Sequence, residues 1–173
     1  MQHGSDQMTD LPLVLRLEEP SDSAAIERLH ERAFGPGRYA RTAYRLREGV
    51  PPIASLCYIA QVGTMLVGSV RLNAIRAGAT KALILGPLAV EPAFSDRGIG
   101  SRLMEMALTQ ARTDGHALVF LVGDEPYYQR FGFKVVPQGR ISMPGPVDPR
   151  RFLVLELQEG ALADVSGVLM PTA

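Results

Sequence analysis

A glycine-rich turn between two apolar runs is the feature that most restricts how this chain can fold. Residues 82–90 are apolar throughout, the segment Arg97-Gly98-Ile99-Gly100-Ser101 follows, and a helical pattern then leads to a second apolar run at residues 117–122. Strand, turn, helix and strand in this order form a βαβ unit, whose crossover joins two parallel strands in a right-handed sense. The sequence therefore predicts a parallel strand pair in the middle of the chain.

The same turn predicts an anion site. A helix that opens on such a turn presents unpaired backbone N–H groups and the positive end of its dipole. Gly98 and Gly100 lack a Cβ, so a phosphate can approach the main chain, and Arg97 adds a cation. A tight βα turn without a ligand is the alternative. A dinucleotide fingerprint would need a third glycine at Leu103, and a Walker loop is absent, which disfavours a nucleotide-binding α/β protein.

Further strands and helices are expected on both sides of this unit. Gly63-Thr64 has the spacing of a two-residue hairpin, residues 139–149 are expected to form a loop, and the tail from Glu159 is weakly patterned. Ile26, Leu29 and Ala33 would form the buried face of the first helix. We expect strands at residues 13–17, 56–62, 65–76, 82–90, 117–122, 133–136 and 152–157. A first helix is expected from a cap at Ser21, Asp22 or Ser23 to about Phe34, and further helices at residues 39–48, 98–113 and 126–130.

Composition restricts the partners of the chain. Its 18 basic and 18 acidic residues balance, which suggests neither nucleic acid nor a membrane surface as a partner. No apolar run approaches the ~20 residues that cross a bilayer. The single cysteine, Cys57, fits a reducing cytoplasm and is expected to be a buried small hydrophobe rather than a nucleophile. The three scattered histidines suggest no metal site, and we expect residues 1–10 to form a flexible leader before one domain at residues 11–173.

Three segments together resemble the GNAT superfamily of acyl-CoA-dependent N-acetyltransferases. They are Leu85-Gly86-Pro87-Leu88-Ala89-Val90-Glu91-Pro92, Arg97-Gly98-Ile99-Gly100-Ser101 and Tyr128-Gln129-Arg130-Phe131-Gly132-Phe133. The loop motif of that family is commonly written Gln/Arg-x-x-Gly-x-Gly/Ala, and its later signature is Tyr-x-x-x-Gly-Phe. The resemblance covers about residues 13–157. One position departs from it: Ser95 stands where the family has Gln or Arg, and Arg97 is expected to supply that charge instead.

The resemblance implies an α/β (α+β mixed) fold with a central mixed sheet of about six to seven strands. Two central parallel strands would splay apart, and the pantetheine arm of acetyl-CoA would lie between them. The implied function is acetyl transfer to a primary amine by direct attack in a ternary complex; the alternative is a catalytically silent acyl-CoA-binding sensor of the same fold. The implied cofactor-binding residues are Leu88, Ala89, Val90, Asp96, Arg97, Gly98, Ile99, Gly100, Ser101 and Arg102.

The chemistry of acetyl transfer indicates which side chains to look for. A thioester and an amine must be aligned, the tetrahedral oxyanion needs a donor, and the departing thiolate needs a proton or a hydrogen bond. A tyrosine, with an ordinary pKa of about 10, is protonated at neutral pH and can supply the proton. By resemblance Tyr128 is the general acid and the N–H of Leu88, or of a neighbour, the oxyanion donor. Tyr127 would point about 100° away from Tyr128 on a helix.

The general base and the acceptor stay open at this point. A chain of water molecules is one candidate for the base, and Glu31, Glu48, Glu125, His30 and Glu91 are others. The acceptor is expected to be a small-molecule or peptide amine, held by residues 34–52 and 137–150. A homodimer is a candidate assembly, because residues 64–78 could form a long exposed strand.

Overall fold

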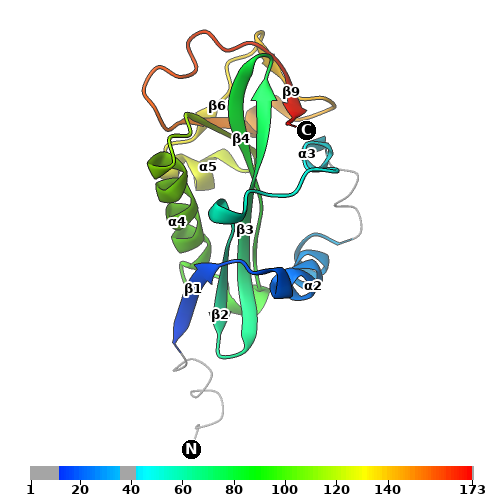
Figure 1. The fold of residues 1–173 in the computed structure, drawn as a ribbon, viewed down its shortest axis with the longest axis vertical. Coiled ribbons are helices and arrows are strands. Elements are labelled where there is room, and N and C mark those ends of the chain that lie inside the picture. The colour runs from blue at the N-terminus through cyan, green and yellow to red at the C-terminus, as the bar shows by residue number, and fades with distance from the viewer. Residues whose placement is uncertain (1–11, 36–41, 173) are drawn as a thin grey trace, which may run out of the picture.

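One mixed sheet organises the residues that this computed structural model describes, 12–35 and 42–172 (Figure 1). Its main path is β1-β2-β3-β4-β5-β8-β6, and β9 pairs with both β3 and β7. The strands are β1 (Leu13–Leu17), β2 (Tyr58–Val62), β3 (Met65–Ala77), β4 (Thr80–Val90), β5 (Leu118–Val122), β6 (Lys134–Val135), β7 (Ile141–Ser142), β8 (Phe152–Glu156) and β9 (Gly167–Pro171). The helices are α2 (Ser23–Phe34), α3 (Thr42–Arg45), α4 (Ile99–Thr113) and α5 (Glu125–Tyr128).

The central strands β4 and β5 are parallel, as the βαβ pattern predicts, and they soon separate. Their pairing is confined to Leu83 with Val119 and Ile84 with Phe120, although β4 continues to Val90. Beyond Leu85 the β4 strand carries a bulge at Gly86 and Pro87, because Leu85 and Leu88 oppose two β3 residues that are only two positions apart. A bulge bends its strand and is a position that tolerates proline. The bulge therefore lies where the two strands diverge.

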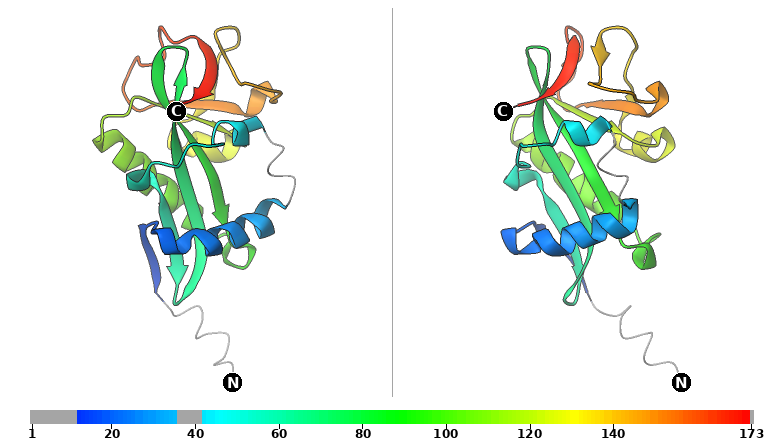
Figure 2. Two further views of the ribbon diagram at one scale, coloured as in Figure 1. Left: turned by 45° about the vertical axis from the view of Figure 1, so that its right-hand side comes forward. Right: turned by 90° about the vertical axis from the view of Figure 1, so that its right-hand side faces the viewer.

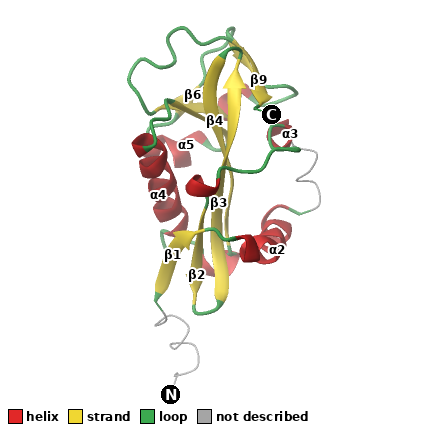
Figure 3. Ribbon diagram, in the orientation of Figure 1, coloured by secondary structure: helices red, strands yellow, loops and turns green. Residues whose placement is uncertain are grey.

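Helices cover the two faces of the sheet. The views of Figures 1 to 3 place α4 on one side of β3 and β4 and α2 on the other. Because side chains alternate along a strand, Leu83 and Leu85 of β4 pack in the cluster that contains Leu103 of α4, whereas Ile84 packs in a second cluster with Phe120. Two apolar layers thus fix β4 in place, and α4 with it.

Several sequence predictions need correction. Residues 139–149 contain β7, and the weakly patterned tail contains β9, so the described residues form nine strands rather than six or seven. Only Leu169 of β9 is fully buried, while Val168 and Met170 are 43% and 46% exposed, so the strand carries little apolar signal. In α2, Ala33 is exposed and His30 is buried in its stead.

Other boundaries moved by a few residues. Leu56 belongs to a 3-10 turn at Ala54–Leu56, and α3 is shorter than the helix expected at residues 39–48, of which residues 39–41 lie outside the described part of the chain. The Asp22 carboxylate does not cap α2; it accepts hydrogen bonds from Arg16 at 2.8 and 2.9 Å. The expected leader, residues 1–10, also lies outside the described residues.

The long strand that suggested a homodimer is not an edge. Strand β3 pairs with β2 on one side and with β4 on the other, and β9 adds to its far end. Most of its backbone groups are therefore paired within the sheet, so β3 is not the exposed strand that was expected, and a homodimer stays a prediction. No helix within the described ranges is long and apolar enough to cross a membrane.

Candidate functional site

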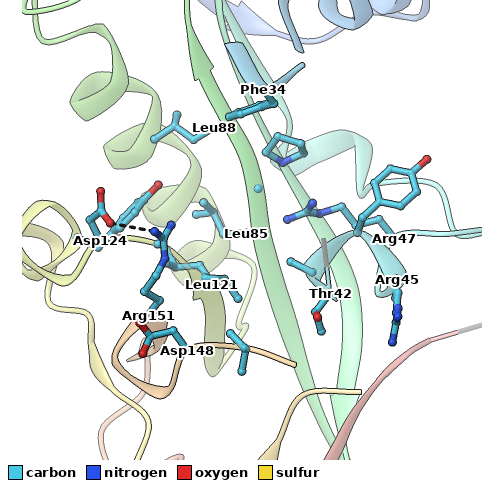
Figure 4. A pocket seen from close by; sticks show the side chains of 18 of the residues that line it. Phe34, Thr42, Arg45, Arg47, Leu85, Leu88, Leu121, Asp124, Asp148 and Arg151 are labelled. Atoms are coloured by element: carbon cyan, nitrogen blue, oxygen red, sulfur yellow. Dashed lines mark ion pairs between the residues drawn. The ribbon is translucent and has the colours of Figure 1, made fainter. Parts of the chain in front are cut away.

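The separation of β4 and β5 opens into a cavity of about 840 Å³. Its walls come from α2, α3, the bulge of β4, the end of β5, α5 and residues 146–151 (Figure 4). The volume is in the range of sites for small ligands, and the wall mixes apolar strand residues with charged side chains. This cavity is the candidate active site.

The glycine-rich turn opens α4 as predicted. Gly98 is the N-cap of the helix and has φ 73°, a left-handed conformation that glycine adopts at little cost. The amides of Gly98, Ile99, Gly100 and Ser101 have no backbone acceptor among the described residues, as expected for a helix start. Ile99 is 2% exposed and anchors the turn in the core, so the free amides are held in a fixed arrangement. They form an anion cradle.

The charged residues around this cradle are solvent-accessible. Arg97 is exposed, with its guanidinium 5.0 Å above the centre of the Phe94 ring. Ser95 donates a hydrogen bond from Oγ to the carbonyl of Pro92 at 2.8 Å, so the residue that departs from the family motif serves the turn itself. Asp96 and Arg102 are exposed beside them.

Arg130 is a further cation at the cradle that the sequence analysis did not assign. Its Nη2 donates to Oγ of Ser101 at 3.0 Å, and its guanidinium lies 4.6 Å from the centre of the Tyr127 ring. Because Ser101 is in the first turn of α4, this contact ties the 3-10 turn Gln129–Phe131, which directly follows α5, to the anion cradle. Arg130 lies within the motif segment Tyr128–Phe133, and this position could have identified it from the sequence.

The two adjacent tyrosines have different surroundings. Tyr128 packs against the α4-side cluster, edge-on to Phe133, and leaves no room for a Cβ at Gly123. Burial raises the pKa of Tyr128 to about 12. Tyr127 directs its hydroxyl toward α4, where a Cβ on Gly100 would lie 2.8 Å from the oxygen. Both residues line the cavity, so both can reach a ligand.

Of the candidate bases, His30 is the one that lines the cavity. It is 4% exposed, and its ring lies 5.8 Å from that of Phe34. Glu91 instead forms an ion pair with Arg32 at 2.7 Å. The other three candidates, Glu31, Glu48 and Glu125, lie outside the cavity wall. Glu27, which the sequence analysis did not consider, lines the cavity from the same helix as His30.

Three arginines of the described residues also line the cavity. Arg151 forms an ion pair with Asp124 at 3.4 Å, drawn as a dashed line in Figure 4. Arg45 donates from Nη1 to the carbonyl of Pro144 at 3.4 Å. Arg47 lies against the bulge at Gly86, and burial lowers its pKa to about 10, which leaves it a cation at neutral pH. No sequence motif distinguished these residues from other surface arginines.

Cys57 is a buried thiol away from the cavity wall. It is 1% exposed, and its Sγ donates to the carbonyl of Ile53 at 3.2 Å. Burial raises the pKa of Cys57 to about 11, so the reactive thiolate is scarce at neutral pH. Within residues 12–35 and 42–172, no three His, Cys, Asp or Glu side chains are grouped as metal ligands would be.

Comparison with known proteins gives this fold and site a family. The acetyltransferase (GNAT) domain family matches residues 54–135. The uncharacterized N-acetyltransferase YhbS of Escherichia coli K12 is 26% identical over 91% of this chain and 95% of its own length, and YjhQ of the same organism is 29% identical over 73% and 72%.

Solved structures agree with the sequence relatives. The E. coli YhbS structure in complex with CoA superposes with a TM-score of 0.79 at 25% identity, covering 94% of this chain and 91% of that one. A GNAT family acetyltransferase from Brucella melitensis, solved with acetyl-CoA, gives 0.58 at 26% identity, covering 87% and 98%. Residues 54–135 thus match an acetyltransferase (GNAT) domain, and the chain shares the fold of these N-acetyltransferases over most of its length, which confirms the resemblance and the fold class expected from the sequence.

Proposed function

We propose that this protein transfers an acetyl group from acetyl-CoA to a primary amine by direct attack in a ternary complex. The observation that carries the proposal is the separation of β4 from β5 beyond Ile84 and Phe120, beside the anion cradle that opens α4. Acetyl-CoA is the cofactor of the family, and the structural relatives described above were solved with CoA or acetyl-CoA. The acceptor is a small-molecule or peptide amine.

The chain offers distinct groups to each part of the cofactor. The amides of Gly98 to Ser101 would hold the diphosphate, with Arg97 and Arg130 as neighbouring cations. Asp96 and Arg102 flank this position. The edge of β4 that faces β5 is unpaired from Leu85 to Val90, so alternate residues of the stretch Leu88, Ala89 and Val90 would present backbone N–H and C=O groups to the amide groups of a pantetheine arm.

Acetyl transfer then uses side chains of the cavity. The backbone N–H of Leu88 would donate a hydrogen bond to the oxyanion formed when the neutral amine attacks the thioester carbonyl carbon. The Tyr128 hydroxyl would give its proton to the sulfur as the carbon–sulfur bond breaks. His30 or water would take the proton lost by the amine. Because its pKa is about 12, the Tyr128 phenol is protonated at neutral pH and can donate its proton when the thiolate leaves.

Binding and turnover are tested separately. Calorimetric titration with acetyl-CoA should show one site, and release of free thiol from acetyl-CoA should accelerate in the presence of a mixed amine panel. Tight binding without thiol release from any amine would identify the alternative, a silent acyl-CoA sensor. Absence of binding would overturn the proposal itself.

Location and assembly stay predictions. A cytoplasmic location agrees with the buried, unoxidised thiol of Cys57. A homodimer would have to use a surface other than β3, and light scattering at several concentrations measures it directly.

A further inference from the structure

Arg47 is a half-buried cation whose guanidinium makes no hydrogen bond or ion pair with any described residue, and its Nε atom is fully buried without an acceptor. Figure 4 shows the side chain extending toward β4. A charge removed from water is costly unless an opposite charge or hydrogen bonds compensate it. A ligand that enters the cavity can supply that compensation.

The place of Arg47 distinguishes between the two reactants. A Cβ on Gly86 would lie 2.7 Å from Nη2 of Arg47, so the guanidinium rests on the bulge where β4 and β5 diverge. A Cβ on Gly100 of the anion cradle would lie 3.6 Å from the side chain of Val90, and an extended strand covers roughly 13 Å from Gly86 to Val90. The phosphates of a cofactor held at that cradle therefore do not reach Arg47. The anion it lacks belongs to the other reactant.

The other described arginines of the cavity wall are already engaged. Arg151 is paired with Asp124 at 3.4 Å, and Arg45 reaches the carbonyl of Pro144 and points away from β4 in Figure 4. The described acids of the wall do not form an ion pair with Arg47 either. Arg47 is thus the cation that the cavity holds ready for an incoming group.

We propose that the acceptor is a small amine that also carries a carboxylate, and that Arg47 binds this carboxylate. The proposal rests on the acetyl transfer proposed above. A planar guanidinium matches a carboxylate with two parallel hydrogen bonds. It also repels a second ammonium group, so a polyamine is disfavoured. With its carboxylate at Gly86, the acceptor holds its amine beside the neighbouring residues of β4, where the thioester lies in the proposed mechanism.

Paired acceptors test this assignment. Each amino acid of a panel is compared with its own carboxamide in the thiol-release assay, so that each pair differs only in the carboxylate. We expect the wild-type protein to favour the acids by about ten-fold or more in kcat/KM. Arg47→Gln should remove this preference while the Kd of acetyl-CoA stays unchanged. Arg45→Gln, which changes an arginine of the same wall, should keep the preference.

The remaining outcomes separate this inference from the proposed function. Equal or faster turnover of the carboxamides by the wild-type protein overturns the role of Arg47 but leaves acetyl transfer intact. A weaker Kd for acetyl-CoA in Arg47→Gln would assign Arg47 to the cofactor and overturn it too. If no acceptor reacts, calorimetry on the CoA-bound protein compares N-acetylglycine with its amide, and equal binding of the two overturns the inference.

A stability measurement excludes a merely structural role. Removing an uncompensated buried charge should leave the melting temperature of Arg47→Gln equal to or above that of the wild-type protein. A clear decrease in the melting temperature would mean that Arg47 supports the fold, and would count against a ligand-binding role.

Discussion

Tyr127 and Tyr128 are neighbours in sequence, yet the fold gives them different partners. Their rings meet edge to face at 4.8 Å, which fixes the direction of each hydroxyl relative to the other. Tyr128 is held by the apolar cluster, whereas Tyr127 lies between α5 and the first turn of α4. A hydroxyl that is fixed in place can donate a proton at one defined point, so only one of the two is expected to serve the sulfur.

Replacing Tyr128 by Phe should lower kcat by a factor of roughly 10² to 10⁴, the usual contribution of a general acid. The Kd of acetyl-CoA should change little, because the ring and its packing remain. Steady-state kinetics together with calorimetry measures both quantities.

Tyr127→Phe is the matched comparison. It removes the neighbouring hydroxyl without disturbing the ring stack, and we expect a kcat much closer to that of the wild-type protein. If instead Tyr127→Phe loses turnover and Tyr128→Phe keeps it, the general acid is Tyr127.

Among individual residues, the sequence allowed us to predict only those that stand in recognisable motifs. The cradle residues and Tyr128 stand in recognisable patterns, so they could be named before the fold was known. Arg47, Arg130 and Glu27 could not, because their relevance depends on which strand ends lie near them. His30 was one of several equal candidates until α2 turned it inward.

Helix α4 combines a structural and a binding role at its first turn. Gly100 is half-buried, and a Cβ there would lie 2.8 Å from the Tyr127 hydroxyl, 3.6 Å from Val90 and 4.0 Å from Leu88. Its backbone is not in the left-handed region, so an alanine can adopt the same conformation. The glycine is thus explained by space above the backbone rather than by its dihedral angles.

Gly100→Ala should weaken acetyl-CoA binding by about ten-fold or more, because the added methyl group occupies the approach to the free amides. The melting temperature should stay level or rise, since alanine is the better helix former by up to about 1 kcal/mol. Calorimetry measures the change in the Kd of acetyl-CoA, and thermal unfolding independently measures the change in melting temperature. Thr109→Ala, on the exposed face of α4, is the control and should leave the Kd unchanged; a Kd for Gly100→Ala equal to that of the control would contradict the cradle.

The far end of the β3–β4 hairpin is held by close backbone contact with β9. Gly78 has φ +58°, and a Cβ there would overlap the carbonyl oxygen of Ser166. Sequence pattern did not reveal this contact, because β9 has a single fully buried residue and few strand signals.

Gly78→Ala should therefore lower the free energy of unfolding by more than about 2 kcal/mol, since it adds a backbone clash to a left-handed conformation. Gly115→Ala is the matched control, because Gly115 has φ +86° but no atom within 4 Å of the added methyl. Its cost should be only about 1 kcal/mol. Urea unfolding of both variants measures the difference. An equal loss of unfolding free energy in the two variants would mean that the backbone at Ser166 moves to make room for the methyl group.

For the whole molecule, the raised pKa values of two of its acidic groups, the Cys57 thiol and the Tyr128 phenol, predict a loss of stability in alkali. Burial raises the pKa of Cys57 to about 11 and that of Tyr128 to about 12, so the folded state holds these protons longer than the unfolded state. Their contribution is complete below the ordinary pKa values of thiol and phenol, and it is lost as the pH rises through the folded values.

We expect the free energy of unfolding to fall by about 1.4 kcal/mol near pH 10 from Cys57 alone. Urea unfolding at pH 8 and pH 10 measures the change. Cys57→Ala should reduce the slope whatever it does to the absolute stability, and an unchanged slope would show that the thiol does not contribute.

The overall architecture was the part most accessible from sequence. Long apolar runs and the helix period identify β4, α4 and β5, because these elements are buried on one or both faces and their patterns are strong. Short elements such as β7 and β9 depend on pairing with distant segments, and that pairing leaves no local pattern. The wall of the cavity comes from six segments that are distant in sequence, and it is not visible in any local pattern for the same reason.

The divergence of β4 and β5 also has a kinetic consequence. The anion cradle belongs to α4, on one face of the sheet, while Arg47 reaches the same gap from the face that α2 and α3 cover. The cofactor and the acceptor therefore enter the site from different faces of the sheet, so both can be bound at the same time. Double-reciprocal plots of initial rates should cross rather than run parallel.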